Sequence, residues 1–191
     1  ASTFTNLSAN MPDFTGQIDG IDPFAVQGGY NLTLAVKPDN PSVVFLGGTN
    51  LYRSTDGFSS TANTEWIGGY AKGTSVAFNL PTHPDIHNLV FDPSNPSRAI
   101  CANDGGIQYT DNIMATNTAP GIVTWVGLDN YQTLQYYHVG IDPASGMDFI
   151  GGAQDNGTFL RQEANAPPNK QDKLNSGDGG AAAISDLATN P

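Results

Sequence analysis

A short segment of the sequence combines two histidines with a carboxylate. It reads His83-Pro84-Asp85-Ile86-His87 and comes directly before an apolar run. In an extended backbone, alternate side chains share one face and lie roughly 6–7 Å apart, which would bring His83, Asp85 and His87 together. Two imidazoles and a carboxylate can hold a divalent metal such as Zn²⁺, or act as an acid–base group. The structural alternative is that each side chain pairs with backbone groups or a neighbouring element.

Three further acidic residues lie in glycine-rich turns. They are Asp104 before Gly105-Gly106, Asp155 before Asn156-Gly157, and Asp178 between Gly177 and Gly179. Turns that recur at one level of a repeat fold can line one channel or face, so these carboxylates are candidate ligands for Ca²⁺ through their oxygens. Asp and Gly are also ordinary turn residues, so a solvated turn is the alternative.

Two adjacent tyrosines, Tyr136 and Tyr137, are further binding candidates, together with His83 and His87. Exposed aromatic rings would suit stacking on sugar rings, whereas buried ones would be core residues. The residue types therefore allow a metal, acid–base or glycan site, and the choice depends on the elements that position them.

These candidates lie within a pattern that occurs three times along the chain. Each copy has an apolar strand-like run, a proline turn, a second apolar run and a polar turn, and its first turn contains Pro38, Pro93 or Pro143. The prolines are spaced by 55 and 50 residues. We expect blade-like repeats at residues 28–70, 87–128 and 136–165, and the start of a fourth at 181–191.

Four short strands in each repeat predict an all-β protein built of four-stranded antiparallel sheets. The expected fold over residues 1–191 is a β-propeller of about three to four blades, which is an incomplete ring. A β-sandwich is the alternative, although its strands would not normally repeat their turn sequences so closely.

Composition excludes several functional classes. Seven Lys and Arg residues against 18 Asp and Glu give a formal net charge of −11, which would repel nucleic acid and anionic membrane surfaces. The sequence has no apolar run long enough to span a bilayer. Cys101 is the single cysteine and lies in an apolar run, so we expect a buried, inert thiol.

The repeats resemble the BNR or Asp-box propellers, a family that includes sialidases, xyloglucan hydrolases, sortilin-type receptors and large secreted bacterial surface proteins. The resemblance rests on Ser54-Thr55-Asp56-Gly57 followed by Trp66, and more weakly on Asp111 followed by Trp125. It implies that Ser54, Asp56 and Asp111 stabilise turns while the tryptophans pack beneath them. In the xyloglucan hydrolases a catalytic carboxylate lies shortly before the Asp-Pro turn, so the resemblance makes Asp85 the candidate catalytic residue.

Two functional hypotheses follow. The first is an extracellular or cell-surface module for protein or glycan interaction or assembly, without catalysis in this segment. The second is a fragment of a glycoside hydrolase that acts on a polysaccharide, with Asp85 in its active site. In either case another part of the same polypeptide, or neighbouring copies, must cover the open sheet edges, since unpaired edges promote aggregation. Ca²⁺ at the glycine-rich turns is the candidate cofactor, and neither nucleic-acid binding nor membrane insertion is expected.

Overall fold

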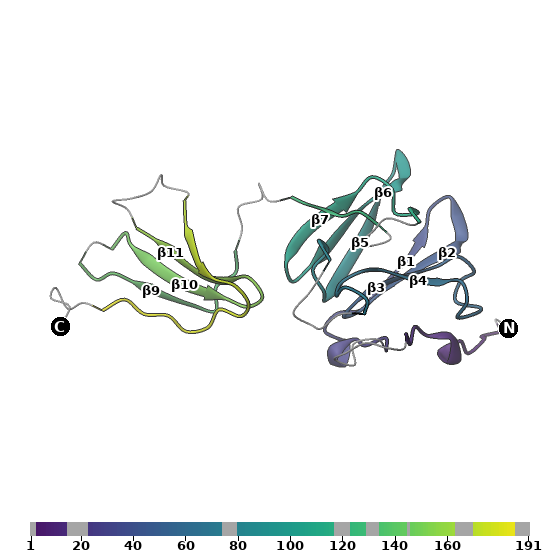
Figure 1. Ribbon diagram of the computed structural model, residues 1–191, viewed down its shortest axis with the longest axis horizontal. Helices are drawn as coiled ribbons and strands as arrows, with labels where there is room; N and C mark the ends of the chain where they lie inside the picture. The colour runs from purple at the N-terminus through teal and green to yellow at the C-terminus, as the bar shows by residue number, and fades with distance from the viewer. Residues whose placement is uncertain are drawn as a thin grey trace. The chain divides into compact units, whose positions relative to one another are not determined.

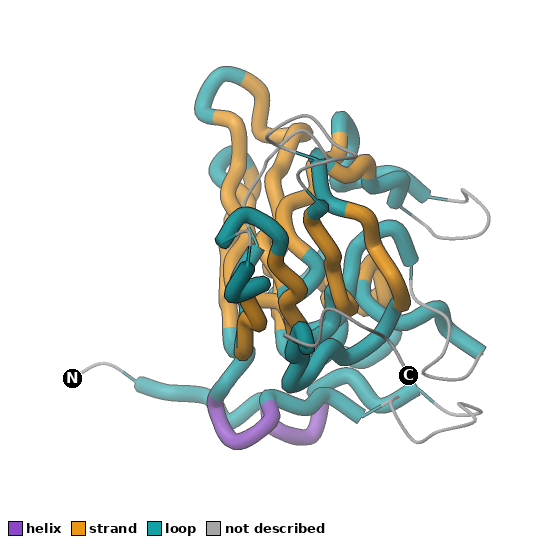
Figure 2. The backbone as a smooth tube through the Cα atoms, turned by 90° about the vertical axis from the view of Figure 1, so that its left-hand side faces the viewer, coloured by secondary structure: helices purple, strands orange, loops and turns teal. Residues whose placement is uncertain are grey.

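The computed structural model describes residues 3–14, 23–73, 80–116, 123–128, 134–144, 146–162 and 170–185. The chain divides into two compact units, residues 1–130 and 131–191. Helical structure in the described residues is limited to two short 3-10 turns, η1 (Ser8–Asn10) and η2 (Gln27–Gly29) (Figure 2). Within the same residues, no helix has the length and apolar character needed to cross a membrane.

The first unit contains two four-stranded antiparallel sheets, each with its strands in sequence order (Figure 1). The first sheet consists of β1 (Thr33–Lys37), β2 (Asn40–Gly47), β3 (Leu51–Ser54) and β4 (Thr64–Gly68). The second consists of β5 (Ile86–Asp92), β6 (Asn95–Asn103), β7 (Gly106–Thr110) and β8 (Val126–Gly127).

The second unit contains one sheet with the same sequential antiparallel order. Its strands are β9 (His138–Ile141), β10 (Phe149–Ala153), β11 (Gly157–Arg161) and β12 (Asp172–Asn175). A four-stranded antiparallel meander is the form of a propeller blade. The described residues thus confirm the predicted all-β class, with three four-stranded antiparallel sheets that are each consistent with a blade of an incomplete propeller.

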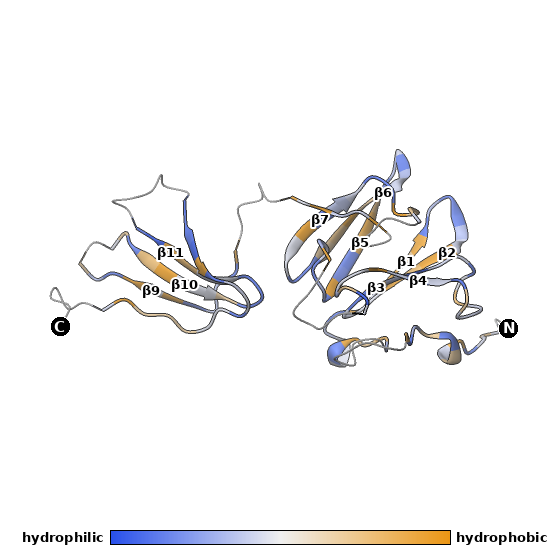
Figure 3. Ribbon diagram, viewed as in Figure 1, coloured by the Kyte–Doolittle hydropathy of each residue, from blue (hydrophilic) through white to orange (hydrophobic). Residues whose placement is uncertain are grey.

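Proline and asparagine shape the first turn of each sheet. Pro38, Pro93 and Pro143 all lie between the first two strands of their sheets. In the first two sheets an asparagine closes the turn, because Asn40 Oδ1 accepts the Ser42 N–H at 3.1 Å and Asn95 Oδ1 accepts the Ser97 N–H at 3.2 Å. Figure 3 shows these two hairpin tips as hydrophilic.

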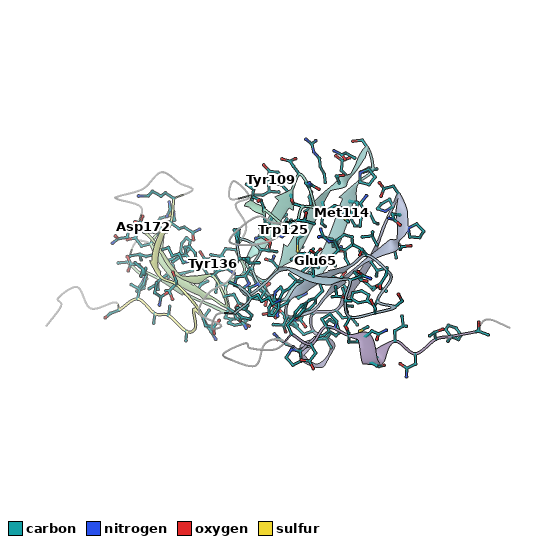
Figure 4. The ribbon with its side chains drawn as sticks, turned by 45° about the vertical axis from the view of Figure 1, so that its right-hand side comes forward. Glu65, Tyr109, Met114, Trp125, Tyr136 and Asp172 are labelled. Carbon is teal, nitrogen blue, oxygen red and sulfur yellow. The ribbon has the colours of Figure 1, made fainter. Side chains whose placement is uncertain are left out.

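The core of the first unit lies between its two sheets. Phe45, Leu51 and Ile67 of the first sheet, Leu89 and Cys101 of the second, and Trp125 just before β8 belong to one buried cluster. Trp125 is labelled in Figure 4. Cys101 is fully buried, as expected, and burial raises the pKa of its thiol to about 12, so the thiolate needed for reactivity is disfavoured. The indole N–H of Trp125 also donates to the Ile67 carbonyl across the two sheets at 2.9 Å.

A buried arginine joins the two sheets as well. Arg53 on β3 is 1% exposed and donates from Nη1 to the Ile113 carbonyl at 2.5 Å and from Nη2 to the Ala115 carbonyl at 3.2 Å. Its Nη2 also pairs with Glu65. The guanidinium therefore satisfies loop carbonyls that follow the second sheet's β7 strand, and its own charge is paired.

The N-terminal segment covers the other face of the first sheet. Phe14 lies 6.0 Å from Tyr52 and 5.8 Å from Trp66 between ring centroids, and Phe24 meets the edge of Tyr52 at 6.3 Å. Trp66 is 4% exposed as a result, and its indole N–H donates to the Gly68 carbonyl at 3.0 Å.

The turn after β3 is stabilised by the predicted Ser54 and Asp56. Ser54 Oγ accepts the Phe58 N–H and donates to Asp56 Oδ1, both at 2.8 Å. Asp56 also accepts bonds from Ser60 and Asn63 at 2.7 and 3.0 Å. These bonds hold the pKa of Asp56 well below its usual range.

The corresponding residue of the second sheet is Asn112, so the prediction for Asp111 was wrong. The Ile113 N–H donates to the Ser97 carbonyl just as the Gly57 N–H donates to the Ser42 carbonyl, each at 2.8 Å. Asn112 therefore holds the position in the second turn that Asp56 holds in the first. Asn112 Oδ1 accepts the Met114 N–H at 3.1 Å. The Asp111 side chain is 69% exposed and pairs with Arg98 at 3.0 Å.

In the second unit, glycines allow close approach of the C-terminal segment to the sheet. A Cβ at Gly152 would lie 2.0 Å from the Gly180 carbonyl oxygen, and one at Gly140 would lie 2.8 Å from Ala183 Cα. The expected fourth repeat at 181–191 begins in this segment. Residues 181–185 form no strand, and residues 186–191 lie outside the described residues.

Candidate functional site

Asp85 lies just before β5, where the second sheet meets the first. Its N–H donates to the Thr49 carbonyl at 3.0 Å, and the next N–H, of Ile86, donates to Gly48 at 2.8 Å. Asp85 is 9% exposed, and its Oδ1 accepts bonds from Gln27 Nε2 at 2.5 Å and Asn31 Nδ2 at 2.6 Å. Backbone and side chain are therefore both fixed at the junction of the two sheets.

Beside Asp85, a second carboxylate is held by two aromatic side chains. Asp104, in the turn between β6 and β7, accepts the Tyr30 hydroxyl at 3.0 Å and lies 2.5 Å from His87 Nε2. The Tyr30 and His87 rings meet edge to face, with centroids 4.9 Å apart. We call the six residues Gln27, Tyr30, Asn31, Asp85, His87 and Asp104 the Asp85 cluster.

The two carboxylates of the cluster influence each other. Burial raises the pKa of Asp85, and the negative charge of Asp104 raises it further. The Asn31 hydrogen bond and the charges of His83 and His87 act in the opposite direction. Asp85 therefore keeps its proton to a higher pH than an exposed aspartate does, which is a property of a general acid and also of a buried structural carboxyl.

The predicted one-faced strip of His83, Asp85 and His87 does not form. Asp85 has φ +62°, so the backbone is left-handed there and the alternation of an extended strand is interrupted. His83 Nδ1 lies 3.1 Å from the Pro84 oxygen, and its side chain covers Gly105, where an added Cβ would lie 2.4 Å from His83 Cβ and 2.6 Å from the ring carbon Cγ. His87 instead pairs with Asp104. Left-handed backbone at a non-glycine residue costs free energy and is concentrated at functional sites.

The acidic turns of the second unit do not supply a metal centre in the described residues. Asp178 Oδ1 accepts the Asp155 N–H at 3.0 Å, so it stabilises the neighbouring turn. Asp104 belongs to the first unit and to the Asp85 cluster. Across the described ranges, no three or more His, Cys, Asp or Glu side chains gather in a way that would hold a metal ion. Asp104 lies in the first unit, whereas Asp155 and Asp178 lie in the second, so a Ca²⁺ site shared by Asp104, Asp155 and Asp178 stays a prediction.

The two tyrosine candidates differ in their surroundings. Tyr136 is half-buried, packs on Gly151, and meets Phe149 and Phe159 edge to face at 6.2 and 6.4 Å. Burial raises the pKa of its hydroxyl, which bonds to Gln171. Tyr137 is 58% exposed, and its hydroxyl bonds to Gln154. Only Tyr137 presents most of its ring to solvent.

Sequence reasoning missed three members of the cluster. Gln27, Tyr30 and Asn31 come from a segment before the first strand, 54 to 74 residues away from the carboxylates they contact. The local signal was the motif Gln27-Gly28-Gly29-Tyr30-Asn31, in which Gln27 and both glycines have positive φ. That motif indicates a tight turn but does not reveal which carboxylate it meets.

The comparisons with known proteins give a weak likeness to solved structures. No family model matches the sequence, and no curated protein matches it. Among solved structures, the chain is similar to an ancestral GH74 enzyme at 12% identity and a TM-score of 0.37. That alignment covers 78% of this chain and 19% of the enzyme, so the chain spans about a fifth of the enzyme's length.

Proposed function

We propose that this chain is part of a secreted or cell-surface propeller of the Asp-box type, and that it binds a glycan at the Asp85 cluster without catalysis. The observation that carries the proposal is the exposed Tyr30 ring, 57% accessible, beside two carboxylates and two amide side chains. Sugars present apolar faces that stack on such rings and hydroxyls that bond to such polar groups.

The bonding within the cluster favours binding over catalysis. Asp85 Oδ1 already accepts two amide bonds, and Asp104 is held by Tyr30 and His87. Carboxylates fixed in this way orient a ligand well, because they do not need to reorganise when it arrives. The extracellular location is proposed from the Asp-box resemblance and from the turn geometry at Ser54 and Asp56.

Calorimetric titration of the 191-residue chain with soluble oligosaccharides tests this function. We expect binding that is lost in Tyr30→Ala and retained in Tyr137→Ala, which removes an equally exposed tyrosine from the second unit. Binding that survives Tyr30→Ala, with an unchanged melting temperature, would exclude the cluster as the glycan site.

The second candidate function is glycoside hydrolysis, which the raised pKa of Asp85 favours. A buried carboxyl that keeps its proton can protonate a leaving group, and a second carboxylate such as Asp104 would complete the pair. Asp85→Asn keeps the shape and removes the acid. Loss of activity on a β-glucan or related polysaccharide, at an unchanged melting temperature, would establish the hydrolase and defeat the non-catalytic proposal.

The partner that we propose is a further blade-like sheet, from another part of the polypeptide or from a neighbouring copy. The face of the second sheet formed by Val90, Ile100 and Val126 is about half exposed, and a hollow of about 750 Å³ lies along it. Large exposed apolar faces mark interaction sites. Sedimentation should show self-association of the chain that Ile100→Asp abolishes; a monomer at all concentrations would argue against a neighbouring copy.

A further inference from the structure

We infer that copies of this chain associate head to tail, with the second sheet of one copy packed against the first sheet of another. This inference rests on the proposed partner, a further blade-like sheet, and specifies that a second copy supplies it and through which residues. It follows from the contact between the two sheets of the first unit and from the equivalence of their residues.

The two sheets of the first unit meet through different faces. The first sheet contributes Ala35 and Phe45, and the second contributes Leu89 and Phe91. The Phe45 and Phe91 rings lie 5.4 Å apart between centroids. We call the face with Ala35 and Phe45, or with their counterparts in another sheet, the receiving face. The face with Leu89 and Phe91, or with their counterparts, is the inserting face.

The receiving face of the second sheet is open. In each sheet this face has a row of paired residues that begins three positions before the turn proline and crosses all four strands. The row of the first sheet is Ala35, Phe45, Arg53 and Glu65. The matching row of the second sheet is Val90, Ile100, Tyr109 and Val126. An ion pair in the covered row is thus replaced by an aromatic and an aliphatic side chain, although the three aliphatic residues are about half exposed.

The inserting face of the first sheet is open along its first strand. Leu34 and Val36 precede the turn proline by four and two residues, the same spacing as Leu89 and Phe91 in the second sheet. Leu34 is 66% exposed and Val36 is 50% exposed. The N-terminal segment covers the aromatic residues of this face on β3 and β4. The part that it leaves open is on β1, and it corresponds to the part of β5 that packs against the first sheet.

The first unit therefore has one open face of each kind. Exposed apolar faces of this kind mark interaction sites. Since the two open faces are the counterparts of two faces that already pack on each other, a second copy can cover either of them through the same type of contact. A head-to-tail contact leaves one open face of each kind at the ends of an assembly, so association continues until a ring closes.

Charge opposes this association, and apolar burial favours it. Each chain has a formal net charge of −11, so two copies repel each other. The charged residues beside the open receiving face are Asp92, Arg98 and Asp111, and Arg98 already pairs with Asp111 at 3.0 Å. Salt screens the repulsion and leaves the apolar contact intact, so self-association should strengthen as the salt concentration rises.

The test uses two variants of the full 191-residue chain, each of which removes one face. Leu34→Asp alters the inserting face and Ile100→Asp the receiving face. Each should weaken self-association in sedimentation at least about tenfold, because burying an unpaired carboxylate is costly. Both positions are exposed, so both variants should fold. Leu174→Asp is the matched control, because it places the same charge at an exposed position of the second unit and should leave association unchanged.

A mixture of the two variants tests the head-to-tail arrangement directly. The Leu34→Asp chain keeps its receiving face, and the Ile100→Asp chain keeps its inserting face. An equimolar mixture should therefore form a one-to-one dimer and nothing larger, whereas each variant alone stays monomeric. If either variant has a lowered melting temperature, Val36→Asp and Val90→Asp replace the same two faces and should give the same result.

The outcomes separate this inference from the proposed function. Self-association that Ile100→Asp abolishes and Leu34→Asp does not would overturn the inference and leave the second sheet as the partner face. A mixture that stays monomeric while the wild type associates would overturn the head-to-tail arrangement. A wild-type monomer at all concentrations would overturn any contact between copies, but would leave the glycan site, which Tyr30→Ala tests. Association that weakens with salt would indicate ion pairs and overturn the apolar contact.

Discussion

The turns after β3 and β7 share a backbone hydrogen bond, but different side chains stabilise them. In both, the turn N–H bonds back to a serine carbonyl, Gly57 to Ser42 and Ile113 to Ser97. In the first sheet Ser54 and Asp56 carry five further bonds among the turn residues. In the second, the side chains of Thr110 and Asn112 accept the N–H groups of Asn112 and Met114.

The second turn receives its additional support from the neighbouring sheet. Arg53 of the first sheet donates to the Ile113 and Ala115 carbonyls, which lie within and just after the second turn. The first turn is therefore stabilised by its own carboxylate, and the second by a buried cation from another sheet. The comparison teaches that a repeated turn can lose its acidic residue when packing against a neighbour supplies the missing hydrogen bonds.

The largest loss of stability should follow from removing the buried Trp125 side chain, which comes after the second turn. Trp125 is 3% exposed within the core between the two sheets, so Trp125→Ala should lower the free energy of unfolding by about 3–5 kcal/mol. Val126→Ala, at a neighbouring exposed position, should change it by less than about 0.5 kcal/mol. Denaturant unfolding measures both. A loss under about 1 kcal/mol for Trp125→Ala would show that the second sheet does not depend on this packing.

The next effect concerns the cation that joins the sheets. Arg53→Met keeps much of the buried volume but leaves the Ile113 carbonyl without its donor, so we expect a loss of about 3 kcal/mol. Arg98→Met is the control, because Arg98 is 55% exposed and its pair with Asp111 should contribute at most about 1 kcal/mol. Equal losses in the two variants would remove the distinction drawn between the two turns.

The fold could be predicted largely because its signals are local. Proline and asparagine at fixed places in a hairpin act within a few residues, and Pro38, Pro93 and Pro143 all lie in the expected turns. The second box turn was misassigned by one residue because Asp111 resembles the box aspartate. The strand register that identifies Asn112 depends on a bond from Ile113 to Ser97, which residue types do not reveal.

The candidate site could be predicted only in part, because its geometry is not local. Asp85, His87 and Asp104 were recognised as chemically capable residues, and the structure brings them together. The left-handed backbone at Asp85 was not expected, since non-glycine residues rarely adopt it. Tyr30 and Asn31 reach the site from a distant segment, and a single sequence carries no signal for such a contact.

A smaller difference is expected from the two hydroxyls that begin the turns. Ser54→Ala removes an oxygen that accepts two N–H groups and donates to Asp56, so it should cost about 1–2 kcal/mol. Thr110→Val keeps the shape and removes one acceptor for the Asn112 N–H, and it should cost about 1 kcal/mol. Thermal unfolding should rank Ser54→Ala below Thr110→Val in stability. The reverse order would mean that the second turn relies more on its own side chains than the first.

The smallest effect is a pH dependence that only the first turn should show. Asn63, Ser60 and Ser54 hydrogen bonds lower the folded-state pKa of Asp56, whereas in the unfolded chain the group should titrate near its ordinary value of about 3.9. A lowered folded pKa means that the ionised form favours folding. The stabilisation is therefore complete above about pH 5 and is lost as the pH falls below about 4.

Asp56→Asn should flatten the rise of stability between about pH 2 and 4. Some slope should remain, since Asp39 and Asp92 also have lowered pKa values. Asp111→Asn removes one carboxylate from the second turn and should leave that slope unchanged, which melting temperatures across this range would measure. An equal flattening in both variants would show that Asp56 contributes no more to the pH dependence of stability than Asp111 does.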